Sequence, residues 1–180
     1  MIRKLSGQFT RIKSVQRGTI TVADGSISNT ATITEVVVAN CDIQMLGLST
    51  TSTNTQWSSR WFTVKLTNST TITVARGSGS AGNGVTIVSY ELTEYAAGSF
   101  KSRQAGVIAQ GTGTSATATV TAVDMSNSIL RLNGVVDGAA ATEYEKSQMK
   151  AVLTNSTTIT ISRGANGADG DVAYQLLEGY

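Results

Sequence analysis

A segment of twelve residues occurs twice in this chain of 180 residues. Leu66–Gly77 returns as Leu153–Gly164, at an offset of 87 positions, and 10 of the 12 residues are identical. A shorter match precedes it at almost the same offset, since Lys13–Gln16 resembles Lys101–Gln104. Self-similarity at a fixed spacing is typical of copies of one structural unit. The sequence therefore predicts an internal duplication that produces two tandem domains.

Within each copy, apolar residues alternate with Thr or other polar residues, as in Thr19–Val22, Thr71–Val74 and Val85–Leu92. This alternation turns one face of a strand toward a core and the other toward water, which is typical of antiparallel sheets. Ser and Thr together make up 47 residues, and Thr also suits a pleated sheet. Glu143–Val152 comes nearest to a helical pattern, but its counterpart in the first copy argues against a helix. We therefore predict an all-β fold with two tandem antiparallel β-sandwich or barrel-like domains.

The repeat also predicts where the chain divides. Residues 1–11 form a basic N-terminal arm, 12–95 the first β-domain, 96–99 a short linker and 100–180 the second β-domain. The linker reads Ala-Ala-Gly-Ser, which separates two regions of alternating sequence. Each predicted domain has the size of one small β-sandwich.

Three absences in the composition narrow the possible chemistry. The chain has no His and no Pro, and Cys41 is its one cysteine. Without His there is no Ser-His-Asp or Cys-His pair and no His-ligated zinc, and one cysteine cannot form an intrachain disulfide. The acidic residues are scattered, so we expect no enzyme and no cofactor. The oxygen-rich segment 166–171 is interpreted as a turn rather than a metal site, because its counterpart, 78–84, has no carboxylate.

The N-terminus lacks the apolar core of a secretory signal, and no apolar run reaches the ~18 residues of a membrane-spanning helix. We therefore expect a chain that folds in the cytoplasm and has no membrane partner. Pro commonly protects the exposed edges of sheets, and its absence calls for another form of protection. Contact with neighbouring subunits would hide these edges, although charged residues and Gly at the edges would serve as well.

The segment Ile12–Thr19, with the pattern Ile-Lys-Ser-x-Gln-x-Gly, precedes a Thr-alternating strand and then Leu-Thr-Asn-Ser-Thr-Thr-Ile-Thr. This arrangement resembles small virion structural proteins of tailed bacteriophages, in which one Ser/Thr-rich β-module follows such an opening. The opening is intact only in the first copy, since the second reads Phe100-Lys-Ser-Arg-Gln-Ala-Gly106. The resemblance covers nearly the whole chain. It implies a phage origin rather than one place in the particle, and no catalytic residue comes with it.

The start of the chain is rich in cations, and its first acidic residue is Asp24. An arm of this kind either lies on an acidic partner surface or forms a solvated terminus. Nucleic acid is disfavoured, because no aromatic residues alternate with the cations to stack on bases. The candidate contact residues in this region are Arg3, Lys4, Arg11, Lys13 and Arg17.

Trp61 has no aromatic counterpart in the second copy, where Gln148 stands. If Phe62 points into the core, strand alternation turns Trp61 to the outer face, beside Arg60. Because Trp and Arg dominate interface hot spots, both are candidate partner contacts, although incidental packing explains the position equally well. A platform for a glycan ring is a weaker alternative.

Arg76 and Arg163 occupy equivalent positions in the two copies. A feature that both copies retain favours a structural role. We expect each arginine to pair within its own domain, with Glu94 and Glu178 as candidate partners.

These observations favour a non-enzymatic structural component of a tailed-phage virion. The first hypothesis is a capsid decoration protein that stabilises the particle through contacts with copies of itself, with a trimer among the options, and with capsid proteins. The alternative is a tail-tip or fibre-base protein that binds a host-surface glycan or receptor. In both cases we expect the protein in the virion, after assembly in the host cytoplasm.

Overall fold

The computed structural model describes residues 11–51, 61–77, 84–137, 144–167 and 169–180. These form an all-β fold with one short α-helix, α1 (Tyr144–Ser147), and two short 3-10 helices, η2 (Val38–Asn40) and η4 (Met125–Asn127). We call the strands β1–β6 the N-half and the strands β7–β12 the C-half. The N-half contains β1 (Ile12–Val22), β2 (Ser28–Thr32), β3 (Cys41–Thr50), β4 (Phe62–Asn68), β5 (Thr71–Arg76) and β6 (Thr86–Tyr95). The C-half contains β7 (Ser102–Ala109), β8 (Ser115–Thr119), β9 (Ser128–Asp137), β10 (Lys150–Asn155), β11 (Thr158–Ser162) and β12 (Gly170–Glu178).

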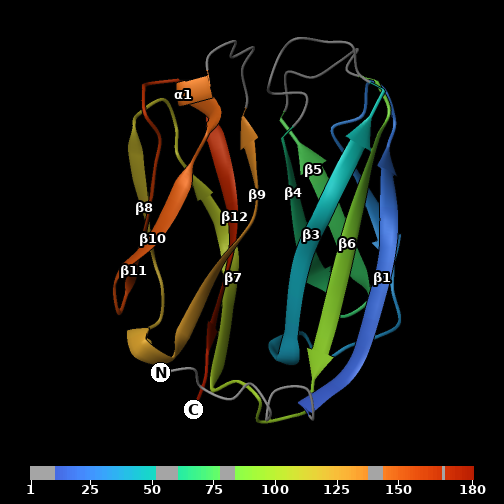
Figure 1. Cartoon of the computed structure of the whole chain (residues 1–180), viewed down its shortest axis with the longest axis vertical. Coiled ribbons are helices and arrows are strands. Elements are labelled where there is room, and N and C mark those ends of the chain that lie inside the picture. The colour runs from blue at the N-terminus through green and yellow to red at the C-terminus, as the bar shows by residue number, and fades with distance from the viewer. Residues whose placement is uncertain (1–10, 52–60, 78–83, 138–143, 168) are drawn as a thin grey trace, which may run out of the picture.

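The strands form antiparallel sheets that face one another in layers (Figure 1). One three-stranded sheet has the order β1-β6-β3, and another has the order β10-β11-β8. A six-stranded sheet, β2-β5-β4-β9-β12-β7, runs through both halves. Its two parts join at one pair of residues, Thr63 in β4 and Gly134 in β9. The architecture is therefore all-β and sandwich-like, as the alternation predicts.

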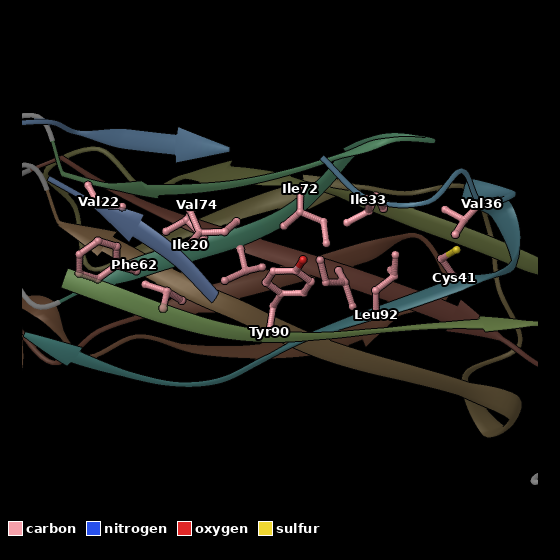
Figure 2. Close-up of a cluster of buried hydrophobic side chains, with 13 residues drawn as sticks. Ile20, Val22, Ile33, Val36, Cys41, Phe62, Ile72, Val74, Tyr90 and Leu92 are labelled. Atoms are coloured by element: carbon pink, nitrogen blue, oxygen red, sulfur yellow. The ribbon is translucent and has the colours of Figure 1, made fainter. Parts of the chain in front are cut away.

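The hydrophobic core forms two clusters. The N-half cluster includes Ile20, Phe62, Val74 and Leu92, whose side chains meet between β1-β6-β3 and β2-β5-β4 (Figure 2). The C-half cluster includes Ile108, Ile159, Val172 and Leu176. In β5, buried and half-buried residues alternate along the strand, so the Thr-rich sequence buries Ile72 and Val74 and turns the threonines the other way. The prediction that Phe62 belongs to the core is confirmed.

The repeated Leu-Thr-Asn-Ser-Thr-Thr segment forms a hairpin in each half. Asn68 Oδ1 accepts a hydrogen bond from the Thr70 amide at 2.9 Å, and Asn155 Oδ1 accepts one from the Thr157 amide at 2.9 Å. An Asn side chain that bonds the backbone two residues later stabilises a tight turn. The hydrogen bonds of this turn therefore explain why both halves contain the sequence Leu-Thr-Asn-Ser-Thr-Thr.

The Ile-Lys-Ser-x-Gln-x-Gly opening is also explained by contacts inside the N-half. Lys13 Nζ and Ser14 Oγ donate to the two carboxylate oxygens of Glu94, at 2.9 and 3.2 Å. The Gln16 amide both donates to and accepts from the backbone of Thr34. A Cβ at Gly18 would lie 2.8 Å from the Tyr90 hydroxyl oxygen, so a side chain at this position would displace the Tyr90 ring.

The C-half repeats each of these contacts. Lys101 Nζ and Ser102 Oγ donate to Glu178 at 2.8 and 3.0 Å, and Gln104 bonds the backbone of Thr121 in both directions. A Cβ at Gly106 would lie 3.0 Å from the Tyr174 ring. The matched residues thus connect β1 to β6 and to the loop after β2 in the N-half. In the C-half they connect β7 to β12 and to the loop after β8.

Arg76 and Arg163 each bond within their own half, but their partners differ from the predicted ones. Arg76 donates to the carbonyl oxygens of Ser26 at 2.7 Å and Ala23 at 3.0 Å. Arg163 donates to the carbonyl oxygens of Gly113 at 3.0 Å and Gly111 at 2.8 Å. The candidate pairing with Glu94 and Glu178 is therefore corrected. The guanidinium groups fix the loop before β2 or β8, because each group carries several donors that can bond backbone carbonyls of that loop.

Glu94 and Glu178 predict how stability depends on pH. Burial alone would raise the pKa of Glu94, but the bonds from Val37, Lys13 and Ser14 outweigh it and lower this pKa. The bond from Lys101 lowers the pKa of Glu178. A carboxyl with a lowered pKa in the folded state stabilises the fold above its unfolded pKa of about 4.3, and this stabilisation is lost as the pH falls through the folded-state value. We expect the E94Q/E178Q double variant to be less stable than wild type at pH 7 and to lose less stability on acidification.

Thermal unfolding at pH 7 and at a series of values below pH 4.3 measures this effect. Glu145→Gln, at an exposed position, is the matched control and should follow the wild-type pH profile. Parallel profiles for the wild type and the double variant would contradict the prediction.

Candidate interaction surface

β3 is an edge strand of its sheet, and the C-half covers that edge. The Cys41 carbonyl accepts a hydrogen bond from Arg103 Nε at 2.7 Å. The Ile43 amide donates to Gln175 Oε1 at 3.4 Å, and Arg103 Nη2 donates to the same oxygen at 2.9 Å. Side chains of β7 and β12 therefore satisfy backbone groups that an open edge would leave to water or to another strand.

Asp42 completes this polar cluster. Its Oδ1 accepts from Gln175 Nε2 at 2.7 Å, and its Oδ2 lies 3.1 Å from Arg131 Nε as an ion pair without the alignment of a hydrogen bond. Burial raises the pKa of Asp42, although Arg131, the amides of Gln44 and Gln175, and Arg103 oppose this effect. Burial also lowers the pKa of Arg103. The cluster joins the two halves through oppositely charged groups and a fully buried amide.

The outer face of the β7-β12-β9 sheet is the surface that the N-half contacts. Val172, Tyr174 and Leu176 of β12 point into the C-half cluster, and the residues between them, Ala173 and Gln175, are buried as well. Both faces of β12 are therefore covered. An alternating sequence usually leaves one face of a strand exposed, but β12 is buried on both faces because the N-half covers its outer face.

The corresponding face of the β1-β6-β3 sheet is open. Because Ile20, Val22 and Val88 point into the core, strand alternation turns Val15, Arg17 and Ile87 outward. Val15 and Ile87 are exposed, and so is Leu46 at the bulge in β3. Val15 faces Thr93 and Ile87 faces Thr21, so these apolar side chains are spread along the face, with the Arg17–Glu91 ion pair between them. A sheet face that no other element covers and that exposes apolar side chains is a candidate interaction surface. The candidate functional site is therefore the outer face of β1-β6-β3, and sequence reasoning missed it.

Three of the predicted basic contact residues bond within the chain. Arg11 Nη1 donates to the Gly98 carbonyl at 3.1 Å, Lys13 pairs with Glu94 at 2.9 Å, and Arg17 pairs with Glu91 at 2.6 Å. The Lys13 and Arg17 side chains remain more than half exposed. Arg3, Lys4 and Arg60 lie outside the described residues. Contact of these cations with a second protein stays a prediction.

Trp61 lies directly before β4 and is partly buried against the C-half cluster. Its buried Nε1 makes no hydrogen bond within the described part of the chain. The expectation that this ring stands on a free outer face is therefore corrected, because it packs between the two halves. A further contact with another protein stays a prediction.

The described residues contain neither a cluster that could bind a metal ion nor a helix that could span a membrane. No three His, Cys, Asp or Glu side chains among them gather closely enough to bind one metal ion. In the same part of the chain, no helix has the length and apolar character to cross a membrane. Cys41 is a free, buried thiol, and burial together with the nearby charge of Glu94 raises its pKa to about 11.

Comparison with family models, curated proteins and solved structures finds no match to this chain.

The Asp42 cluster predicts a specific loss of stability. Asp42→Ala leaves the Gln175 amide and the Arg131 guanidinium without their acceptor, and an unsatisfied buried donor costs about 1–3 kcal/mol. We expect D42A to lower the free energy of unfolding by about 2 kcal/mol, and D42N to lower it less, since Asn keeps an acceptor for Gln175. Urea unfolding gives these values. The Cys41 thiol should also react faster with a thiol reagent in D42A, because the covered edge of β3 loosens.

Asp171→Ala is the matched control, because Asp171 is exposed on β12. A D42A variant as stable as D171A would show that the cluster does not hold the halves together.

Gly134 offers a second test of the contact between the halves. A Cβ at this position would lie 1.9 Å from the Phe62 carbonyl oxygen, whereas a Cβ at Gly47 would meet nothing within 4 Å. Both glycines have a positive φ, 110° and 148°, so both Ala variants carry backbone strain. We expect G134A to be several kcal/mol less stable than G47A, because G134A also separates β4 from β9. Equal thermal stability of the two variants would contradict a close β4–β9 contact.

Proposed function

We propose that this chain is a non-enzymatic structural component of a tailed-phage virion. Its first role in this proposal is capsid decoration, in which it stabilises the particle through contacts with copies of itself and with capsid proteins. The observation that carries the proposal is the open outer face of β1-β6-β3, which exposes Val15, Leu46 and Ile87 and contrasts with the covered strand β12 in β7-β12-β9. A surface of this kind suits a protein that acts by binding other proteins.

We further propose that the two halves are tandem β-sandwich domains that arose by duplication. The matched strand orders β1-β6-β3 and β7-β12-β9 support this proposal, as do the equivalent bonds around Glu94 and Glu178. The proposed division at residues 96–99 is supported by the turn there, in which the Ser99 amide and hydroxyl both donate to the Ala96 carbonyl. Tyr95 and Phe100 pack edge to face across this turn, with ring centroids 5.0 Å apart.

Many copies on one particle make weak contacts effective. Binding to the folded, assembled state stabilises a shell by mass action, and several contacts per copy multiply the effect. In this role the chain needs no cofactor and no membrane. The partly exposed cations Lys13 and Arg17 add a basic margin near the apolar face. Their pairing with carboxylates of the same chain favours protein contact over nucleic acid in this proposal.

Particle fractionation tests the proposed function. Virions and empty heads from the source are purified on a density gradient, and the chain is quantified by mass spectrometry relative to the major shell protein. The proposal predicts that the chain cosediments with empty heads in amounts comparable to the shell protein. It also predicts that particles lacking the chain lose their genome at a lower temperature.

Absence of the chain from purified particles would overturn the proposal. A few copies per particle, together with competition by the purified chain against adsorption to host cells, would overturn the decoration role in favour of tail-tip receptor binding.

A further inference from the structure

The cleft between the two halves has a volume of about 280 Å³ and is lined by residues of both. Lys65 of β4 reaches it from the N-half, and Arg103 of β7 and Asn133 of β9 reach it from the C-half. Asn133 is only 4% exposed, because the N-half covers it. In this contact the outer face of the β7-β12-β9 sheet meets the edge of the N-half that β3 and β4 form.

The positions equivalent to these three residues are all apolar and exposed. At offsets of 87 or 88, Lys65 corresponds to Val152, Arg103 to Val15 and Asn133 to Leu46. Strand pairing supports this correspondence, since Lys65 faces Thr73 and Val152 faces Thr160 in the equivalent hairpins. The exposed fractions are 51% for Val152, 37% for Val15 and 56% for Leu46. Val152, Val15 and Leu46 lie on three different strands, but their equivalents all line the one cleft between the two halves.

The glycines at the bulges follow the same pattern. Gly134 lies against β4, whereas Gly47, its equivalent, has a positive φ and nothing near its Cβ position. The surface beside Gly47 is therefore free to receive a strand in the way that Gly134 receives β4.

We propose that the chain associates head to tail with a second copy of itself and that this contact repeats the one between its own halves. The outer face of β1-β6-β3 in one copy docks on the edge formed by β9 and β10 in the next. Val152 of one copy then lies between Val15 and Leu46 of the other, in the place that Lys65 takes between Arg103 and Asn133 within the chain. This proposal rests on the self-association that the proposed function includes.

The residues that differ between the halves suit this second contact. Gln175 corresponds to Glu91, and Asp42, the acceptor for the Gln175 amide, corresponds to Ile129. A Glu at position 91 has no amide to donate, and the facing Ile129 offers neither an acceptor nor a like charge. Ile129 is also exposed in the single chain, with 46% of its surface reaching solvent. At this position the second contact lacks the hydrogen bond of the first, and the charge of Glu91 is met by Arg17 of its own chain at 2.6 Å.

A head-to-tail contact uses two different surfaces of each copy. Such contacts close into a ring when the rotation between copies permits and otherwise continue as a filament. Each copy contributes the β1-β6-β3 face and the part of the β9–β10 edge beyond the bridge between Thr63 and Gly134, so blocking either surface alone removes the contact. Mixing the two blocked forms restores one intact pair of surfaces.

The experiment uses two single variants, Leu46→Lys on the face and Val152→Lys on the edge. Light scattering with size-exclusion chromatography measures the mass of the full chain over a series of concentrations. We expect the wild type to exceed the 18.7 kDa of one chain as concentration rises. Each variant should raise the dissociation constant at least tenfold, and an equimolar mixture of the two should recover a complex that contains both.

Val37→Lys is the matched control, because Val37 is 52% exposed and is not equivalent to any residue of the cleft. It should associate like the wild type. Slow reaction of the Cys41 thiol in every variant confirms that each one folds. A wild type that stays at the mass of one chain overturns the proposal, and so does a mixture that shows no complex or a V37K variant that associates as weakly as L46K.

The two proposals fail separately. A chain that associates through Leu46 and Val152 but is absent from purified particles keeps this contact and loses the virion role. A chain that is present in particles but associates equally well as L46K keeps the virion role and loses the head-to-tail contact.

Discussion

The open edge of β3 needs hydrogen-bond partners, and Arg103 and Gln175 supply them from the C-half. A Pro-free all-β chain must protect such an edge by other means, and here the C-half covers it. Asp42 adds a buried carboxylate that fixes the orientation of the Gln175 amide. The arrangement of the two halves depends on this cluster, because the β4–β9 bridge and the packing of Trp61 follow from the same approach of one half to the other.

The residues that hold each half together and those that join the halves follow different rules. Glu94 and Glu178 make equivalent bonds, because each half needs the same clamp between its first and last strands. Asp42, Arg103 and Gln175 have the non-equivalent counterparts Ile129, Val15 and Glu91. Within the chain, the edge of the N-half contacts the face of the C-half. The equivalent face of the N-half and edge of the C-half do not contact each other, so their residues need not match those of the first contact. These differences carry the functional information, and they lead to the proposed contact between copies.

Much of the fold could be predicted from the sequence, because alternation and turn chemistry act locally. The hairpin at Leu66–Gly77 and the core position of Phe62 follow from these local rules. The partners of Arg76 could not be predicted, because they are backbone carbonyls that only the folded loop brings near. The outer face with Val15 and Leu46 was missed for a similar reason. An exposed apolar residue in an alternating strand looks like a core residue until the sheets are placed. The signal that could have revealed it is the set of positions where the two copies differ in polarity.

In the proposed assembly, the edge of β9 and β10 in the C-half receives the open sheet of another copy. Hydrogen–deuterium exchange of the wild-type chain at low and high concentration tests it most directly. Backbone amides at the edges of β9 and β10 should exchange more slowly as concentration rises, while the 3-10 helix η4 (Met125–Asn127) should exchange at the same rate throughout. Exchange at β9 and β10 that does not depend on concentration would contradict the account.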